Sequence, residues 1–172
     1  MTRIIFLDID GVVLPVGACN DSEIETIIRE PFQHLDTLAT RASAGAIECL
    51  RKLATENGAK FVLISTWRGI FPSDFVQSFL DRVGLFDLFH EDWEAPMRGM
   101  PPRPNKGRDI GEWIGDHRVA QRDCIVIDDD DLALREYYGF RVLKQVRPIS
   151  KIGFSRDELA RATKMMVTQP PE

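Results

Sequence analysis

The stretch Arg3-Ile4-Ile5-Phe6-Leu7-Asp8-Ile9-Asp10-Gly11-Val12-Val13 decides the fold of this chain. Its first part places four bulky apolar residues in a row, which is typical of a strand buried on both faces. Such a strand lies in the middle of a parallel sheet. The apolar run leads directly into Asp8 and Asp10, which one isoleucine separates, and then into Gly11. We therefore expect a central strand that ends in two carboxylates.

The two carboxylates pose an electrostatic problem. Side chains alternate along a strand, so Asp8 and Asp10 leave the same side, about 6.6–6.8 Å apart along the chain. Ionised carboxylates this close repel each other, and a proton, a cationic side chain or a metal ion must offset their charge. Open parallel sheets bind ligands beyond the carboxyl ends of their strands, where this pair falls. Gly11 allows a turn that a side chain would obstruct. The alternative is a solvated turn without function.

The composition is that of an ordinary soluble protein. The chain has 172 residues, of which 44% are hydrophobic and 28% are charged, and no apolar run reaches membrane-spanning length. The first strand begins within three residues of the N-terminus, which leaves no room for a signal peptide. Cys19, Cys49 and Cys124 are odd in number and far apart, which indicates reduced thiols. We therefore expect a cytoplasmic protein without a membrane partner.

Helix signals alternate with short apolar runs along the rest of the chain. Capping residues and proline signals predict helices that begin near Ser22, Ser43, Pro72, Asn105 and Ser155. Apolar runs predict strands at residues 60–66, 85–89, 124–127 and 140–143. This alternation indicates an α/β fold, a Rossmann-like three-layer sandwich with a mainly parallel central sheet.

We expect a single domain over residues 1–168 and a loose tail at 169–172. Residues 14–40 form a stretch longer than a simple strand-to-helix loop. This stretch is predicted to be a flap or small lid over the aspartates, and a surface excursion is the alternative. No interval between the motifs is long enough for a large independent cap, so the cap is minimal.

Three of the predicted strands end in polar residues. The polar pairs are Asp8 with Asp10, Ser65 with Thr66, and Asp128 with Asp129. Lys106 begins a predicted helix between the last two pairs. Because ligand sites of open sheets lie beyond the carboxyl ends of the strands, these residues are the candidates for a common site.

In this arrangement the chain resembles the haloacid dehalogenase (HAD) superfamily of phosphotransferases. The resemblance covers that family's four motifs in order, and each motif is weakly specific by itself. The motifs here are Asp8-Ile9-Asp10-Gly11-Val12, then Ser65, then Lys106, then Ile127-Asp128-Asp129. The ordered set, with suitable spacing over most of the chain, is strongly specific.

The resemblance implies a role for each catalytic residue. Asp8 attacks phosphorus and forms an aspartyl-phosphate, while Asp10 protonates the leaving oxygen and then activates water. Lys106 neutralises Asp8 and the bound phosphate as a compact point charge, and a surface lysine is the alternative. Ser65 donates a hydrogen bond to a phosphate oxygen. Thr66 competes with Ser65 for that task, and a strand-end hydroxyl that bonds its own turn is the alternative.

The resemblance also implies a magnesium cofactor. Mg²⁺ prefers oxygen ligands in an octahedron and needs few carboxylates. The family-like ligands are Asp8, the backbone carbonyl of Asp10, and one acid after the predicted strand 124–127. Asp129 and Asp128 both compete for that last place, and we rank Asp129 first.

Several residues near the motifs are candidates for binding the substrate. Trp67 and Arg68 can stack on a base and grip a phosphate, with core packing and a surface ion pair as the alternatives. Gly11 lies at the first motif. Arg103 lies in the proline-punctuated loop 97–108, which contains no acid and suits a phosphodiester backbone.

The expected function is Mg²⁺-dependent hydrolysis of phosphomonoesters by a HAD-type phosphatase. The chain is similar to the HAD domains of the Swiss Army Knife group of RNA repair proteins, which implies polynucleotide phosphate ends as substrates. A small-molecule or nucleotide phosphatase is the competing enzyme, because proline-rich basic loops are often only solvated connectors. The net charge of −5 argues against broad adhesion to nucleic acid but does not exclude a local basic site. A metal-binding scaffold or regulatory protein without turnover is the alternative from another class.

Overall fold

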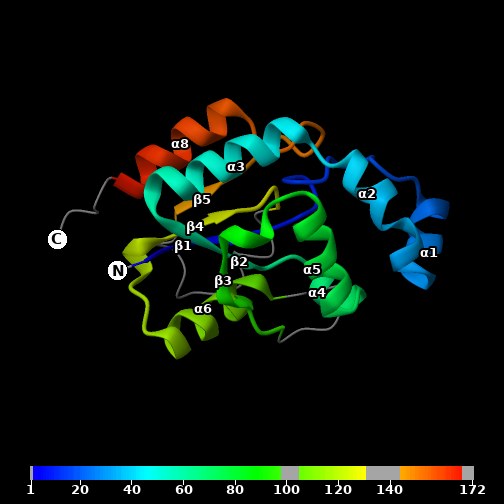
Figure 1. The fold of residues 1–172 in the computed structure, drawn as a ribbon. Coiled ribbons are helices and arrows are strands. Elements are labelled where there is room, and N and C mark those ends of the chain that lie inside the picture. The colour runs from blue at the N-terminus through cyan, green and yellow to red at the C-terminus, as the bar shows by residue number, and fades with distance from the viewer. Residues whose placement is uncertain (1, 98–104, 131–143, 168–172) are drawn as a thin grey trace.

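The computed structural model describes residues 2–97, 105–130 and 144–167. Its core is one five-stranded sheet in the order β3-β2-β1-β4-β5, and every pair of neighbours is parallel (Figure 1). The strands are β1 (Arg3–Leu7), β2 (Ala59–Leu63), β3 (Phe89–Glu94), β4 (Cys124–Ile127) and β5 (Lys144–Val146). The predicted central position of the first strand and the α/β sandwich are confirmed.

The central strand is buried on both faces, as its unbroken apolar run predicts. Ile5 and Leu7 belong to the larger hydrophobic core on one face, whereas Ile4 and Phe6 belong to a second core on the other. This division follows from the alternation of side chains along a strand. Ladders to β2 and β4 hold the strand on either side, so its end has a defined position at the middle of the sheet.

Helices cover both faces of the sheet (Figure 1). Helices α3 (Ala44–Asn57) and α8 (Arg156–Val167) pack side by side over one face, and α5 (Ser73–Arg82) contributes its apolar stripe to the same core. Helix α6 (Lys106–His117) covers the other face through Ile110, Trp113 and Ile114. The structure is therefore a three-layer sandwich.

Local capping chemistry sets the ends of two of these helices. The Ser43 side chain accepts a hydrogen bond from the Ala46 amide at the start of α3, and Gly58 closes that helix with φ 58°. The Asn105 side chain accepts from the Arg108 amide at 2.9 Å and starts α6. Both starting points agree with the sequence prediction. The cap of α6 matters for function, because it makes Lys106 the first residue of that helix.

Residues 14–41 form a small helical insertion after the first strand. It contains α1 (Asp21–Arg29), the 3₁₀ turn η1 (Pro31–His34) and α2 (Leu35–Arg41), and α2 packs against α5. Asn20 and Glu23 form the capping box, so the N-cap lies two residues before the predicted cap Ser22. That prediction was wrong because asparagine caps a helix as well as serine does, and two candidate caps stand close together. The role of this insertion as a lid stays a prediction.

Two predicted strands have other bounds in the structure. The second strand ends at Leu63, so Ser65 and Thr66 lie in the loop after it. The predicted strand 85–89 is a 3₁₀ turn, η2 (Phe86–Leu88), and pairing begins only at Phe89. Because that edge strand is polar, its sequence carries no apolar run. The predicted strand 140–143 and the tail 169–172 lie outside the described residues.

Short helical segments complete the described chain. They are α4 (Trp67–Ile70) and η3 (Gln121–Asp123). Within the described residues, none of the helices is long and apolar enough to cross a membrane. All three cysteines are free.

Candidate active site

Asp8 stands at the end of the central strand, and two neighbours fix its carboxylate. Its Oδ1 accepts a hydrogen bond from the Ile9 amide at 2.8 Å, and its Oδ2 lies 2.8 Å from Lys106 Nζ. Its amide donates to the Ile127 carbonyl at 3.0 Å, so the ladder to β4 continues past the last strand residue. Asp8 is 5% exposed. The carboxylate is therefore held in one orientation at the open edge of the sheet.

Lys106 joins the ends of two strands. Its ammonium group lies 2.8 Å from Asp8 Oδ2 and 2.8 Å from Asp128 Oδ2. Burial lowers the pKa of Lys106, but the attraction of these two carboxylates outweighs it, so the pKa is raised overall. The lysine therefore stays charged. The prediction that residues far apart in the chain converge beyond the strand ends is confirmed for these three.

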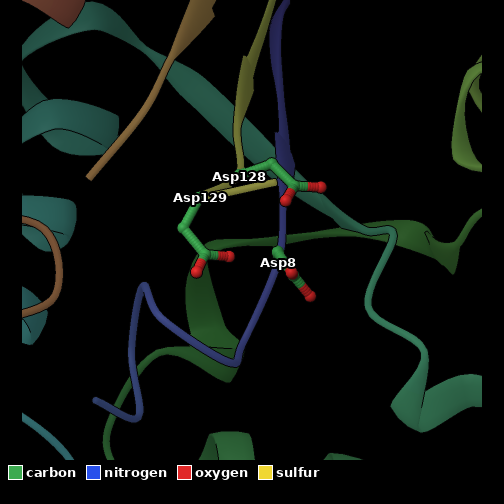
Figure 2. Close-up of side chains that lie close together, drawn as sticks. All are labelled: Asp8, Asp128 and Asp129. Carbon is green, nitrogen blue, oxygen red and sulfur yellow. The ribbon is translucent and has the colours of Figure 1, made fainter. Parts of the chain in front are cut away.

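Asp128 and Asp129 follow β4 and differ in their surroundings. Asp128 is fully buried, and its Oδ1 accepts from the Asp130 amide at 2.9 Å. Burial and repulsion from Asp8 raise the pKa of Asp128, and Lys106 opposes this shift. Asp129 is half-buried. Figure 2 shows that both side chains gather with Asp8 where β1 and β4 end.

This cluster fits a hard divalent cation. Asp8, Asp128 and Asp129 each offer a carboxylate oxygen, and these oxygens all lie within 4.8 Å of one another. Lys106 supplies a single positive charge to these carboxylates, and Asp10 adds another negative charge nearby. A cation with oxygen preference would reduce the remaining repulsion. Asp128 and Asp129, the two candidates for the last cation ligand, both belong to the cluster.

Asp10 meets the cluster from the loop after β1. Its Oδ2 accepts a hydrogen bond from the Trp67 indole Nε1 at 2.9 Å. Burial and the charge of Asp8 raise the pKa of Asp10 to about 6. The hydrogen bond from Trp67 and the positive charge of Lys106 act in the opposite direction and lower this pKa. The Asp10 carboxyl therefore holds a proton closer to neutral pH than an ordinary aspartate does.

Gly11 gives the Asp129 carboxylate the space that it occupies. The φ of Gly11 is 70°, a conformation that side chains disfavour, and a Cβ on Gly11 would lie 2.2 Å from Asp129 Oδ2. A glycine is therefore needed at this position for the turn that the sequence predicts and also for the space beside Asp129. Its predicted contact with substrate stays a prediction.

The hydroxyl residues lie in the loop after β2. Ser65 is fully buried, and its Oγ lies 3.4 Å from the Trp67 amide that donates to it. Thr66 is half-buried. Which hydroxyl contacts a phosphate stays open, because each of them lies near the turn that begins α4.

Trp67 packs in the core, which agrees with the alternative to base stacking. The stacking of a base on its ring stays a prediction. The side chain is 5% exposed, and its ring contacts those of Phe71 and Phe79 with centroids 4.9 and 5.0 Å apart. Its polar edge reaches Asp10. Trp67 therefore positions a candidate catalytic carboxylate.

Arg68 is also committed to the protein interior, which corrects its predicted contact with phosphate. Its guanidinium group lies 3.2 Å from Asp109 Oδ2, and the two side chains are 3% and 0% exposed. The remaining donors reach main-chain carbonyls of residues 64, 65, 95 and 96. The alternative of a surface ion pair is wrong as well, because the pair is buried. Arg103 lies outside the described residues.

Asp109 and Arg147 support the site but were not among the residues predicted from the sequence. Asp109 falls beside Ile110 and Trp113 on the inward face of α6, so a charge on an apolar stripe was the signal that could have revealed the buried pair. Arg147 donates to the Asp129 main-chain carbonyl at 3.2 Å from the segment after β5. The sequence around Arg147 carries no comparable signal.

Known proteins share this arrangement of elements. The family described as the HAD domain in Swiss Army Knife RNA repair proteins matches residues 4–159. A haloacid dehalogenase-like hydrolase from Streptococcus pneumoniae is similar in structure, with a TM-score of 0.53 and 15% identity over 94% of this chain and 90% of that one. An L-2-haloacid dehalogenase from Xanthobacter autotrophicus, with chloropropionic acid covalently bound, has a TM-score of 0.51 and 15% identity over 99% of this chain and 85% of its own. These two likenesses show a common fold. No curated protein matches the sequence.

The buried ion pair predicts a large loss of stability when its cation is removed. In Arg68→Met, Asp109 remains buried without this partner, and we expect the free energy of unfolding to fall by about 3–5 kcal/mol. Arg82→Met is the matched control, because its pair with Asp36 is more than half exposed, and we expect a loss below about 1 kcal/mol. Urea denaturation measures both. Equal midpoints for the two variants would contradict the structural role of Arg68.

Proposed function

Because the chain belongs to the family of HAD domains in Swiss Army Knife RNA repair proteins, we propose that it hydrolyses phosphomonoesters with Asp8 as the nucleophile. The observation that carries the proposal is the position of the Lys106 ammonium, 2.8 Å from both Asp8 and Asp128. This contact holds a carboxylate nucleophile beside positive charge at the open edge of the sheet. A phosphoryl group needs this combination, because its transfer depends mostly on positioning and on cationic stabilisation.

Two displacements complete the proposed reaction. The Asp8 carboxylate attacks phosphorus, the bond to the ester oxygen breaks, and Asp10 gives its proton to the leaving alcohol. Asp10 then takes a proton from water, the water oxygen attacks phosphorus, and the bond to Asp8 breaks to release inorganic phosphate. The hydrogen bond from Trp67 keeps the Asp10 carboxyl in place through both steps.

Mg²⁺ is the proposed cofactor, and its ligands would be Asp8, the Asp10 backbone carbonyl and the acids after β4. A bound Mg²⁺ supplies positive charge to the phosphoryl oxygens. The oxygen-only donor set supports Mg²⁺ over metals that prefer nitrogen or sulfur. Ser65 or Thr66 is proposed to donate to a phosphate oxygen.

Polynucleotide phosphate ends are one candidate substrate class, and the family description supports it. Such a substrate predicts a preference for a 3′-phosphorylated oligonucleotide over mononucleotides, which weakens as salt rises. A small phosphomonoester is the other candidate.

Replacing the nucleophile tests the reaction class. Wild-type protein is expected to hydrolyse an aryl phosphate with Mg²⁺ and to stop in EDTA, and Asp8→Asn is expected to fall to background because an amide does not attack phosphorus. Release of inorganic phosphate measures the rate, and circular dichroism checks the fold. Phosphate on the Asp8 peptide after acid quenching identifies the intermediate. No metal-dependent turnover on any tested monoester would favour the non-catalytic scaffold.

Asp10→Asn separates proton transfer from cation binding. We expect turnover to fall by about 10²–10⁴-fold, which is the usual contribution of a general acid or base. Cation binding should stay within about twofold of wild type, because the proposed ligand is the backbone carbonyl of this residue. Titration calorimetry with Mg²⁺ measures binding independently of activity. Weak binding in a folded variant would place the Asp10 side chain among the ligands.

Asp129→Asn is expected to weaken the cation site itself. A cation that binds only the folded state stabilises it by about 2.7 kcal/mol at 100 times its dissociation constant, so Mg²⁺ should raise the wild-type Tm. We expect most of this rise to disappear in Asp129→Asn, whereas the exposed control Asp116→Asn retains it. Thermal unfolding with and without Mg²⁺ measures the difference. Retention in Asp129→Asn with loss in Asp128→Asn would reverse the ranking of the two acids.

A further inference from the structure

A cavity of about 260 Å³ adjoins Asp10 on the side of the helical insertion. One wall is the segment 14–19 that follows the first motif, and a second comes from α1 and α2. The third wall is α4, whose Trp67 also donates a hydrogen bond to Asp10. In Figure 1, these helices lie toward the same end of the molecule. The cavity therefore begins at a proposed catalytic residue.

The lining is apolar except at that one point. Among the described residues that form the wall, Asp10 is the only charged one, and most of the others are aliphatic or aromatic. The indole N–H of Trp67 is already donated to Asp10. In the part of the chain that the structure describes, the wall thus offers no cationic side chain to a second phosphate and few hydrogen-bond donors to hydroxyl groups.

Exposed apolar side chains gather around this cavity. Of the eight large hydrophobic residues that are exposed in the described chain, four belong to its wall: Val16, Ile24, Ile28 and Ile70. Exposed apolar surface that is concentrated around one concavity is typical of a binding site.

The position of Asp10 orients a substrate between the cluster and the cavity. In the proposed reaction, the phosphoryl group lies at Asp8, and the leaving oxygen lies at Asp10. The group attached to that oxygen then extends past Asp10, and the apolar cavity adjoins the same carboxyl. The cavity is therefore placed to receive the alcohol portion of the ester.

Resting on the proposed function, we propose that this cavity binds the apolar group of a small phosphomonoester, such as an aryl or cycloalkyl phosphate. An apolar cavity of about 150 Å³ is enough to bind benzene, so one of about 260 Å³ accommodates a substituted ring. A nucleotide fits less well, because the edge of its base needs hydrogen-bond partners and further phosphates need cations. The described wall supplies few hydrogen-bond partners and no cationic side chain.

A series of alkyl phosphates tests this specificity. Ethyl, butyl and cyclohexylmethyl phosphate have leaving alcohols of similar acidity, so differences in kcat/KM report on binding of the alkyl group. We expect kcat/KM to rise by at least about tenfold from ethyl to cyclohexylmethyl phosphate, since several CH₂ groups leave water. An equal kcat/KM across the series would overturn the inference, as would preference for a 3′-phosphorylated oligonucleotide.

Variants of the wall locate the effect. In the double variant Ile24→Gln/Ile28→Gln, the wall loses apolar surface without gaining charge. We expect the ratio of kcat/KM for cyclohexylmethyl phosphate to kcat/KM for ethyl phosphate to fall toward one. Val167→Gln is the control, because Val167 is equally apolar and 64% exposed but lies at the end of α8, outside the wall. The control should keep the wild-type ratio. A ratio that Ile24→Gln/Ile28→Gln leaves unchanged would place the alkyl group elsewhere.

Binding of phosphonates separates the failure of this inference from the failure of the proposed function. Calorimetry compares cyclohexylmethylphosphonate with methylphosphonate, neither of which the proposed reaction can cleave. We expect at least about tenfold tighter binding of the larger phosphonate and a more negative heat-capacity change, which marks apolar burial. This result without turnover of any ester would keep the cavity assignment and reject the phosphatase. Equal affinities would overturn the cavity assignment even if esters are hydrolysed.

Discussion

The structure depends on one electrostatic contact, in which the ammonium of Lys106 bridges Asp8 and Asp128 at 2.8 Å each. Parallel strands bring β1 and β4 side by side, and their ladder extends to the Asp8 amide. The resulting pair of buried carboxylates would repel without a cation between them. The Asn105 cap sets the start of α6, so it also sets the position of that cation.

The loop after β2 stabilises the same edge in a different way. Trp67 packs on phenylalanines and donates to Asp10, and Arg68 ties the loop to α6 through Asp109. Two neighbouring residues thus connect the end of β2 with the first motif and with the helix that carries Lys106. A polar network of this kind, with a buried ion pair at its centre, can hold catalytic groups in a fixed geometry.

Asp10 lies at the boundary between two environments. On one side is a crowded cluster of acids and a lysine, which suits phosphate and a divalent cation. On the other side is an apolar cavity with no second charge in its described wall. This contrast divides the tasks of the proposed enzyme, since the charged side would handle the transferred group and the apolar side would select the alcohol.

By itself, the sequence determined the central strand, the α/β class and the convergence of Asp8 with Asp128, because burial patterns and parallel pairing leave little freedom for the strand ends. The place of Lys106 beside them was predicted from the family resemblance. The sequence also located the caps at Ser43 and Asn105, which are local. Only the tertiary structure decided the roles of Trp67 and Arg68. An indole or a guanidinium group suits a ligand as well as a core, and the choice depends on partners distant in the chain, Asp10 and Asp109. The polar edge strand β3 and the cavity walls likewise arise from packing between segments, which no local pattern encodes.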